Sequence, residues 1–209
     1  MKVGTKSLLF GVHQFLWHPL TVFWAWRKLY GTWPNWWQCI SIVFHDVGYW
    51  GKPNIDGPEG REHPIVGARL AAKIAGWLHR YELHPSGPED SWPNDQFCAH
   101  VYFETLFHSR ELATWFKEAP SALCWADKYC ACVEPGWFYL FRARCSGEVA
   151  EFMRNAKPIE DDLMLLSLFT LGFSEAAEEY WFDWYRAKVR NLPEVKKHLA
   201  KPNCFVPTL

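Results

Sequence analysis

The chain has 209 residues, of which 49% are hydrophobic and 22% charged, an ordinary composition for one globular domain with a substantial core. Its formal net charge of −1 argues against a basic surface for duplex nucleic acid or anionic lipid. We therefore expect a small-molecule substrate and neither duplex nucleic acid nor a membrane as partner. The chain has seven cysteines but lacks the two Cys-x-x-Cys pairs of a zinc-binding site, so we expect free thiols in a cytoplasmic protein.

Residues 7–26 carry no formal charge and are long enough to span a bilayer. Two histidines, a glutamine and Pro19 interrupt this stretch, which makes it only moderately apolar. We predict two buried helical pieces that meet at His18, rather than a membrane span or a signal peptide.

Helical signals follow along the N-terminal half. A proline suits a first helical position and a glycine suits a helix end, so Pro19 and Gly31 predict a helix over 19–30. Pro34 begins a second helix that runs towards His45. The region 47–62 is dense in Gly, Pro, Asn and Asp and is expected to be a loop, and a third helix covers 64–81.

The rest of the chain continues in the same way. We expect a loop over 84–95, helices over 97–107 and 120–133, and two or three more helices between 137 and 199. The clearest of these covers 174–190, with Ser174 as its N-cap. No segment alternates over enough residues to require a strand, so the predicted fold class is all-α.

An adjacent histidine and aspartate, His45 and Asp46, end the apolar run of the second helix. Similar side chains recur along the chain: His18 and His63 directly precede prolines, and His108 ends an apolar segment. Asp127 is a charged residue in apolar surroundings, where such groups need a partner or a metal. Imidazoles bind Fe, Mn, Ni, Co or Zn, and carboxylates can bridge two ions. The pattern therefore predicts a site for one or two divalent transition-metal ions.

The ordered series His, His-Asp, His, His, Asp resembles that of the HD-domain superfamily of metal-dependent phosphohydrolases, over about residues 10–135. This resemblance implies a compact helical bundle over 1–135. Residues 136–209 resemble no family, and we expect them to form a helical extension packed on the same domain. The extension either closes over the site or forms a contact between copies of the chain. The resemblance also implies two metal ions, with Asp46 as the bridge, held by His18, His45, Asp46, His63, His108 and Asp127.

Some positions have competitors. His13 competes with His18 as the first ligand, and His100 or His84 competes with His108 as the last histidine of the series. We prefer His18 because an aliphatic helix follows it, and His108 because Ser-Arg follows it directly.

The expected activity is hydrolysis of a phosphate ester in a nucleotide or a related small molecule. The alternative is a mixed-valent di-iron oxygenase of the HD type, which cleaves a C–P or C–C bond with O2. Both activities would depend on Asp46 as the shared ligand.

Cationic side chains near the ligands are candidates for phosphate binding. Arg110 follows His108 and Lys128 follows Asp127, while Lys52 and Arg61 lie in the loop between ligand segments.

Other roles are assigned by position in the sequence. Glu62, next to His63, or Asp56 is a candidate proton donor or ligand-orienting residue. The aromatic residues Tyr49 and Trp50 are candidates for stacking on a base.

Overall fold

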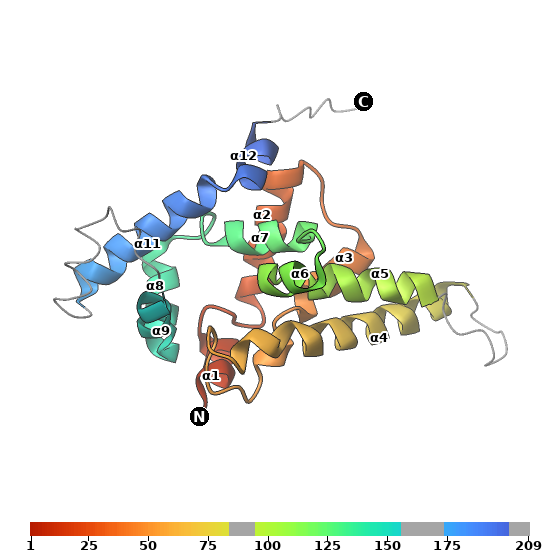
Figure 1. Ribbon diagram of the computed structural model, residues 1–209, viewed down its shortest axis with the longest axis horizontal. Coiled ribbons are helices and arrows are strands. Elements are labelled where there is room, and N and C mark those ends of the chain that lie inside the picture. Colours follow the sequence, from red (N-terminus) through yellow and green to blue (C-terminus); the bar gives the residue numbers. More distant parts are fainter. Residues whose placement is uncertain (84–94, 156–173, 201–209) are drawn as a thin grey trace.

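The computed structural model describes residues 1–83, 95–155 and 174–200, and the regular secondary structure in these ranges is entirely helical (Figure 1). The expected all-α class is confirmed. Among the described residues, none of the helices combines the length and apolar character needed to cross a membrane. None of the cysteines in these ranges forms a disulfide.

The N-terminal part of the chain carries the helices expected to hold the metal ligands. Their bounds are α1 (Val3–Phe10), α2 (Trp17–Tyr30), α3 (Trp36–Phe44), the short 3-10 helices η1 (Val47–Tyr49) and η2 (Gly60–Glu62), α4 (His63–Leu83), α5 (Asp95–Leu106), α6 (Arg110–Phe116) and α7 (Ala122–Cys130).

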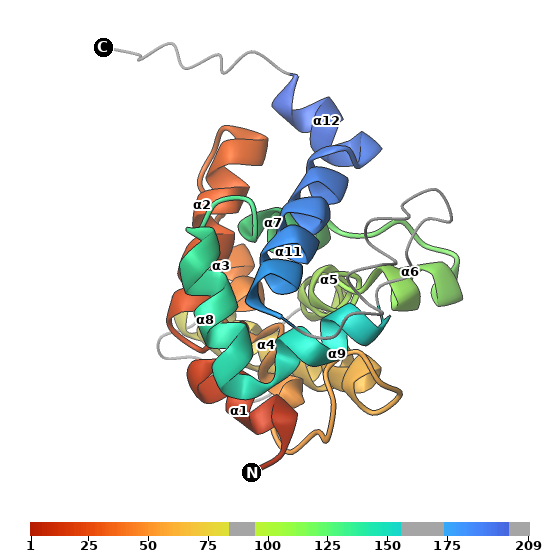
Figure 2. The same ribbon diagram turned by 90° about the vertical axis from the view of Figure 1, so that its left-hand side faces the viewer.

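The C-terminal part contains α8 (Gly136–Ser146), α9 (Glu148–Asn155), α11 (Glu175–Arg190) and α12 (Pro193–Leu199). These are more helices than the two or three expected after residue 137. Figure 2 shows α8, α9 and α11 gathered on the side of the molecule that faces the viewer.

Capping side chains explain several helix ends. Asn35 and Gln38 form a reciprocal capping box at the start of α3, and the Ser174 hydroxyl accepts a hydrogen bond from the Ala177 amide at the start of α11. Helix α2 ends at Gly31, whose φ of 74° places it in the left-handed region that glycine adopts without strain.

The two helices within residues 7–26 are separated by a connection that precedes His18, whereas the sequence predicted that they meet at His18. The chain leaves α1 at Gly11 and re-enters a helix at Trp17, so His18 lies in the first turn of α2. The reason is a set of contacts from distant helices. Arg142 donates hydrogen bonds to the carbonyl oxygens of Gly11 and Val12, each at 2.9 Å. Backbone groups used in this way are withdrawn from a continuous helix.

Two apolar clusters hold the helices together. In the first, Val22, Ile42 and Leu123 join α2, α3 and α7. In the second, Leu140, Met153 and Phe182 join α8, α9 and α11, and Val12 of the α1–α2 connection packs into the same cluster. Helices α4 and α5 run side by side (Figure 1). The C-terminal helices are thus packed directly against the N-terminal part of the chain.

Two glycines allow the chain that follows α3 to lie against the start of α4. A Cβ atom at Gly48 would come within 2.0 Å of the His63 carbonyl oxygen, and one at Gly67 within 2.3 Å of the His45 carbonyl oxygen. No side chain fits in these two places. The close approach therefore fixes the spacing between the segments that carry His45 and His63.

The first prediction concerns this spacing. Gly67→Ala should reduce the free energy of unfolding by about 1–3 kcal/mol, because the added methyl group forces backbone apart in a packed region. Chemical denaturation measures the effect. Gly136→Ala is the control, since its Cβ would meet side-chain atoms at 3.2 Å or more, and it should change stability much less. Equal stability of the two variants would contradict the close approach.

Candidate metal centre

Six histidine and aspartate side chains converge from five segments of the chain. His18 lies in the first turn of α2, His45 caps α3, and His63 begins α4. Asp46 immediately precedes η1. The remaining two are His108, just after α5, and Asp127 within α7. All except Asp127, which is partly buried, are buried.

The first ligand group consists of His18, His45, Asp46 and Asp127. Asp46 Oδ2 lies 3.1 Å from Nε2 of His18 and 3.1 Å from Nε2 of His45. Asp127 Oδ1 lies 3.2 Å from Nε2 of His18 and 3.6 Å from Nε2 of His45. The four ligand atoms all lie within 4.8 Å of one another.

The second group uses the other oxygen of the same aspartate. Asp46 Oδ1 lies 3.3 Å from Nε2 of His63 and 3.6 Å from Nε2 of His108. These three ligand atoms also lie within 4.8 Å of one another. Asp46 therefore connects both groups, with one oxygen directed to each.

Backbone carbonyls determine which nitrogen of three histidines carries the proton. Nδ1 lies 2.7 Å from the Ile42 oxygen in His45, 2.7 Å from the Gly60 oxygen in His63 and 2.6 Å from the Thr105 oxygen in His108. A carbonyl oxygen only accepts hydrogen bonds, so Nδ1 is the donor. A ring in the neutral form that binds a metal then presents the lone pair of Nε2 to the ligand group.

This donor arrangement suits a cation better than it suits hydrogen bonding. Nε2 of His63 and Nε2 of His108 lie 3.0 Å apart, although in the neutral rings both atoms are acceptors. Asp46 Oδ2 is buried and makes no hydrogen bond within the described residues. Lone pairs that face one another without a proton between them are stabilised by a metal ion, so the residues fit one.

The charges of the two carboxylates dominate the first group. Burial alone would lower the pKa of His45, but the negative charges of Asp46 and Asp127 raise it to about 9. Burial would raise the pKa of both carboxyl groups, yet the nearby histidines hold each pKa well below its usual range. Burial lowers the pKa of His63 to about 4, despite its contact with Asp46. Positive charge is therefore held most strongly in the first group.

The competing histidines lie outside both groups. His13 packs against His18, with ring centroids 5.4 Å apart, but its Nδ1 lies 2.8 Å from a carboxylate oxygen of Glu148. His100 is exposed and its ring contacts Trp37. His84 lies outside the described residues.

A cavity of about 560 Å³ opens onto the ligand groups. Five of the six ligands line it, together with side chains from α9 and α11. Within the described ranges, four cations line the cavity: Arg61, Arg110, Lys128 and Lys188. The aromatic residues of the described chain that line it are Tyr49, Tyr139, Phe152, Trp181, Trp184 and Tyr185. The cavity thus has a ligand-bearing wall from the N-terminal part and an aromatic wall that is largely C-terminal.

The candidate phosphate-binding residues take different positions. Arg110 and Lys128 line the cavity and make no ion pair within the described ranges. Arg61 lines it too, but pairs with Glu111 at 3.2 Å. Lys52 pairs with Glu62 at 3.2 Å and is not part of the cavity wall.

Of the other four expected site residues, Glu62 and Trp50 lie outside the cavity wall, whereas Tyr49 and Asp56 line it. The Glu62 side chain is 67% exposed and does not line the cavity, so its position does not suit proton donation there. Trp50 is also exposed and outside the wall. Tyr49 lines the cavity, but its ring stacks on His63 at 3.7 Å. Asp56 lines the cavity, and burial with the charge of Glu151 raises its pKa.

Comparison with known proteins gives no relative: neither a protein-family model, nor a curated protein, nor a solved structure matches the chain. The buried histidine and aspartate cluster in an all-helical fold is nevertheless compatible with an HD-type site.

The second prediction tests the bridging position. Asp46→Ala should lose metal from both groups, because each group loses an oxygen ligand. His63→Gln and His108→Gln should each retain an ion in the first group. Metal content by mass spectrometry and the rise of the melting temperature on metal addition measure the two effects.

His100→Gln is the matched control, since this exposed histidine contacts neither group. Full metal content in Asp46→Ala would exclude the bridging arrangement. Unchanged content in both His63→Gln and His108→Gln would exclude a second ion.

Proposed function

We propose that this protein is a metal-dependent phosphohydrolase that acts on the phosphate ester of a nucleotide or a related small molecule. One observation carries the proposal: the two ligand groups, joined by Asp46, face the same cavity as the cations Arg110 and Lys128. A phosphate group placed there would meet positive charge both from bound metal ions and from these two side chains.

Divalent ions at these ligands would lower the pKa of a bound water and polarise a phosphoryl oxygen. The residues of the chain have complementary tasks. Asp46 and Asp127 supply the only carboxylates of the two groups, so two divalent ions would leave an excess of positive charge for a phosphate. Arg110 and Lys128 then bind the remaining phosphate oxygens, the arginine as a fork and the lysine as a point charge.

The aromatic wall supports an organic phosphate rather than inorganic phosphate alone. Phe152, Trp181 and Trp184 lie on α9 and α11, on the C-terminal side of the cavity. Flat apolar side chains of this kind stack on nucleobases. The Lys188 ammonium group lies 4.8 Å from the centre of the Trp184 ring, which adds positive charge to this wall.

The alternative is the di-iron oxygenase. The observation in its favour is the ligand set itself, because four imidazoles and a bridging carboxylate also suit a pair of iron ions. The same cationic cavity would bind a phosphonate as well as a phosphate.

One experiment separates the two proposals. The protein is purified without oxygen, its metal content is measured, and it is then assayed for phosphate release over a panel of nucleotides and for O2 consumption with phosphonates. Phosphate release supported by Mn, Ni, Co or Zn is the expected result. An iron pair that consumes O2 without releasing phosphate from any nucleotide would overturn the hydrolase proposal.

The third prediction concerns phosphate recognition. Lys128→Met and Arg110→Ala should each lower kcat/KM by about ten- to a hundredfold, because a charge-assisted hydrogen bond contributes about 1.5–3 kcal/mol. Metal content should stay unchanged in both. Steady-state kinetics on the best nucleotide substrate gives the comparison.

Lys73→Ala serves as the matched control, because Lys73 is an exposed lysine on α4 that does not line the cavity. It should retain the parent kcat/KM. If Lys128→Met and Arg110→Ala also retain it, phosphate binding belongs to Arg61 and Lys188 instead.

A further inference from the structure

His13 occupies a position at the cavity that the metal ligands do not explain. It lies in the connection between α1 and α2, lines the cavity, and packs against both the ligand His18 and Tyr49. It belongs to neither ligand group. Its ring is therefore beside the candidate metal centre without being part of it.

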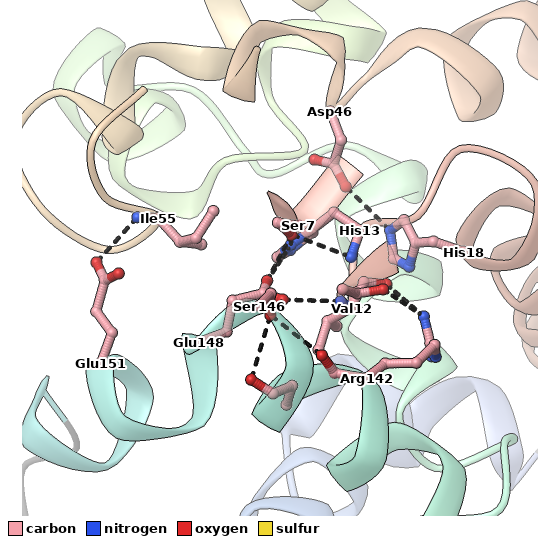
Figure 3. Close-up of polar contacts among 12 residues, drawn as sticks. Ser7, Val12, His13, His18, Asp46, Ile55, Arg142, Ser146, Glu148 and Glu151 are labelled. Carbon is pink, nitrogen blue, oxygen red and sulfur yellow. Dashed lines mark hydrogen bonds and ion pairs between the residues drawn. The ribbon is translucent and has the colours of Figure 1, made fainter. Parts of the chain in front are cut away.

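A buried carboxylate holds the ring in place. Nδ1 of His13 lies 2.8 Å from Oε1 of Glu148, which is fully buried at the start of α9 (Figure 3). The hydroxyl of Ser7 donates to the same oxygen at 2.6 Å, and the Val12 amide donates to the other oxygen at 2.8 Å. Ser146 donates a further hydrogen bond to that second oxygen.

These contacts fix the protonation of the nitrogen that faces Glu148. A carboxylate accepts hydrogen bonds, so Nδ1 of His13 is the donor and Nε2 remains for the cavity. Burial would raise the pKa of Glu148, but the hydrogen bonds from His13, Ser146 and Ser7 lower it, so the group stays ionised.

The connection that carries His13 is held from two sides. Glu148 binds its amide and imidazole, while Arg142 binds the carbonyls of Gly11 and Val12. A Cβ atom at Gly11 would lie 2.2 Å from Oε2 of Glu148, so the backbone passes directly over the carboxylate. Buried charges are costly to desolvate, and apolar residues would hold a connection at lower cost. The arrangement instead orients one imidazole towards the cavity.

We propose that His13 donates a proton to the leaving oxygen of the phosphate ester, and that Glu148 is the residue that positions it. This inference rests on the proposed phosphohydrolase function. It assigns a catalytic residue from outside the ligand set and outside the candidate proton donors Glu62 and Asp56.

The oxygen of water forms a bond to phosphorus, and the bond between phosphorus and the ester oxygen breaks, with its electron pair passing to that oxygen. Nε2 of His13 gives the ester oxygen its proton, so the product leaves as an alcohol. The attacking water releases a proton to the solvent, from which His13 is protonated again. The net reaction consumes one water for each ester hydrolysed.

Two esters that differ only in the leaving group test this role. p-Nitrophenolate leaves readily as an anion, whereas phenolate benefits much more from a proton. His13→Gln should therefore lower kcat on phenyl phosphate by about 10²- to 10⁴-fold, and on p-nitrophenyl phosphate by only a few-fold. Its metal content should equal that of the parent protein, unlike a variant of the ligand His18.

Glu148→Gln should show the same selectivity to a smaller extent, because the imidazole remains but loses its anion. Glu151→Gln is the matched control. It lies one turn further along α9 and accepts hydrogen bonds from the Ile55 and Asp56 amides rather than from His13. We expect it to affect the two esters equally.

A measurement independent of activity accompanies the kinetics. Nitrogen-15 NMR of the histidine rings should report the proton of His13 on Nδ1, and Glu148→Gln should shift that signal. A merely structural contact of His13 would give equal losses on both esters, or none, and either result overturns the proposal. Loss of metal in His13→Gln would overturn it too, since His13 would then be a ligand.

The two proposals fail in different ways. If the parent protein hydrolyses neither ester nor any nucleotide, the phosphohydrolase function fails and the role of His13 falls with it. If the parent protein hydrolyses both esters and His13→Gln shows no selectivity between them, only the role of His13 is wrong.

Discussion

The two oxygens of Asp46 are the constraint on which the rest of the site depends. Oδ2 faces His18 and His45, and Oδ1 faces His63 and His108. A single short side chain can do this only if the end of α3, the start of α4 and the end of α5 meet within a few ångströms. The glycine contacts between the segment after α3 and the start of α4 make that meeting sterically possible. The ligand geometry at Asp46 therefore depends directly on the close packing of these backbone segments.

The C-terminal helices complete the site from the opposite side. Helices α9 and α11 supply an aromatic wall of the cavity, and Glu148 and Arg142 hold the connection before α2. Val12 of this connection also packs in the apolar cluster of α8, α9 and α11. The position of His18 at the start of α2 thus depends on residues more than 100 positions later in the chain. The ligand-bearing helices would lose this support without the C-terminal part.

Local signals in the sequence predicted much of the fold. The helix ends at Gly31 and Ser174 were predictable from the residue types. Glycine adopts the left-handed backbone conformation found at Gly31, and a serine side chain readily accepts the N-cap hydrogen bond found at Ser174. The order of the metal-type residues likewise predicted the six side chains that converge. The break at Gly11 was not predictable, because it results from hydrogen bonds to distant helices. The short helix α6 was also missed, since its seven residues give too short a pattern.

Some site residues also could not be predicted from the sequence, because they reach the site through contacts between segments that are far apart in the chain. Lys188 lies on a helix that the sequence predicted without any role in the site, yet it lines the cavity. Glu148 carries no motif, and its importance arises from a contact with His13 across 135 positions. Conversely, Glu62 adjoins a ligand in sequence but points to solvent, because neighbouring residues on a helical turn face different directions.

The two ligand groups differ in charge, and this difference bears on how substrate would bind. The first group contains both carboxylates, Asp46 and Asp127, whereas the second contains only the shared oxygen of Asp46 and two imidazoles. A divalent ion in the second group would therefore keep more of its positive charge. Arg110 and Lys128 add further positive charge to the same cavity. The anion best suited to this field carries more than one negative charge on closely spaced oxygens, which is the character of a phosphate monoester rather than of a carboxylate.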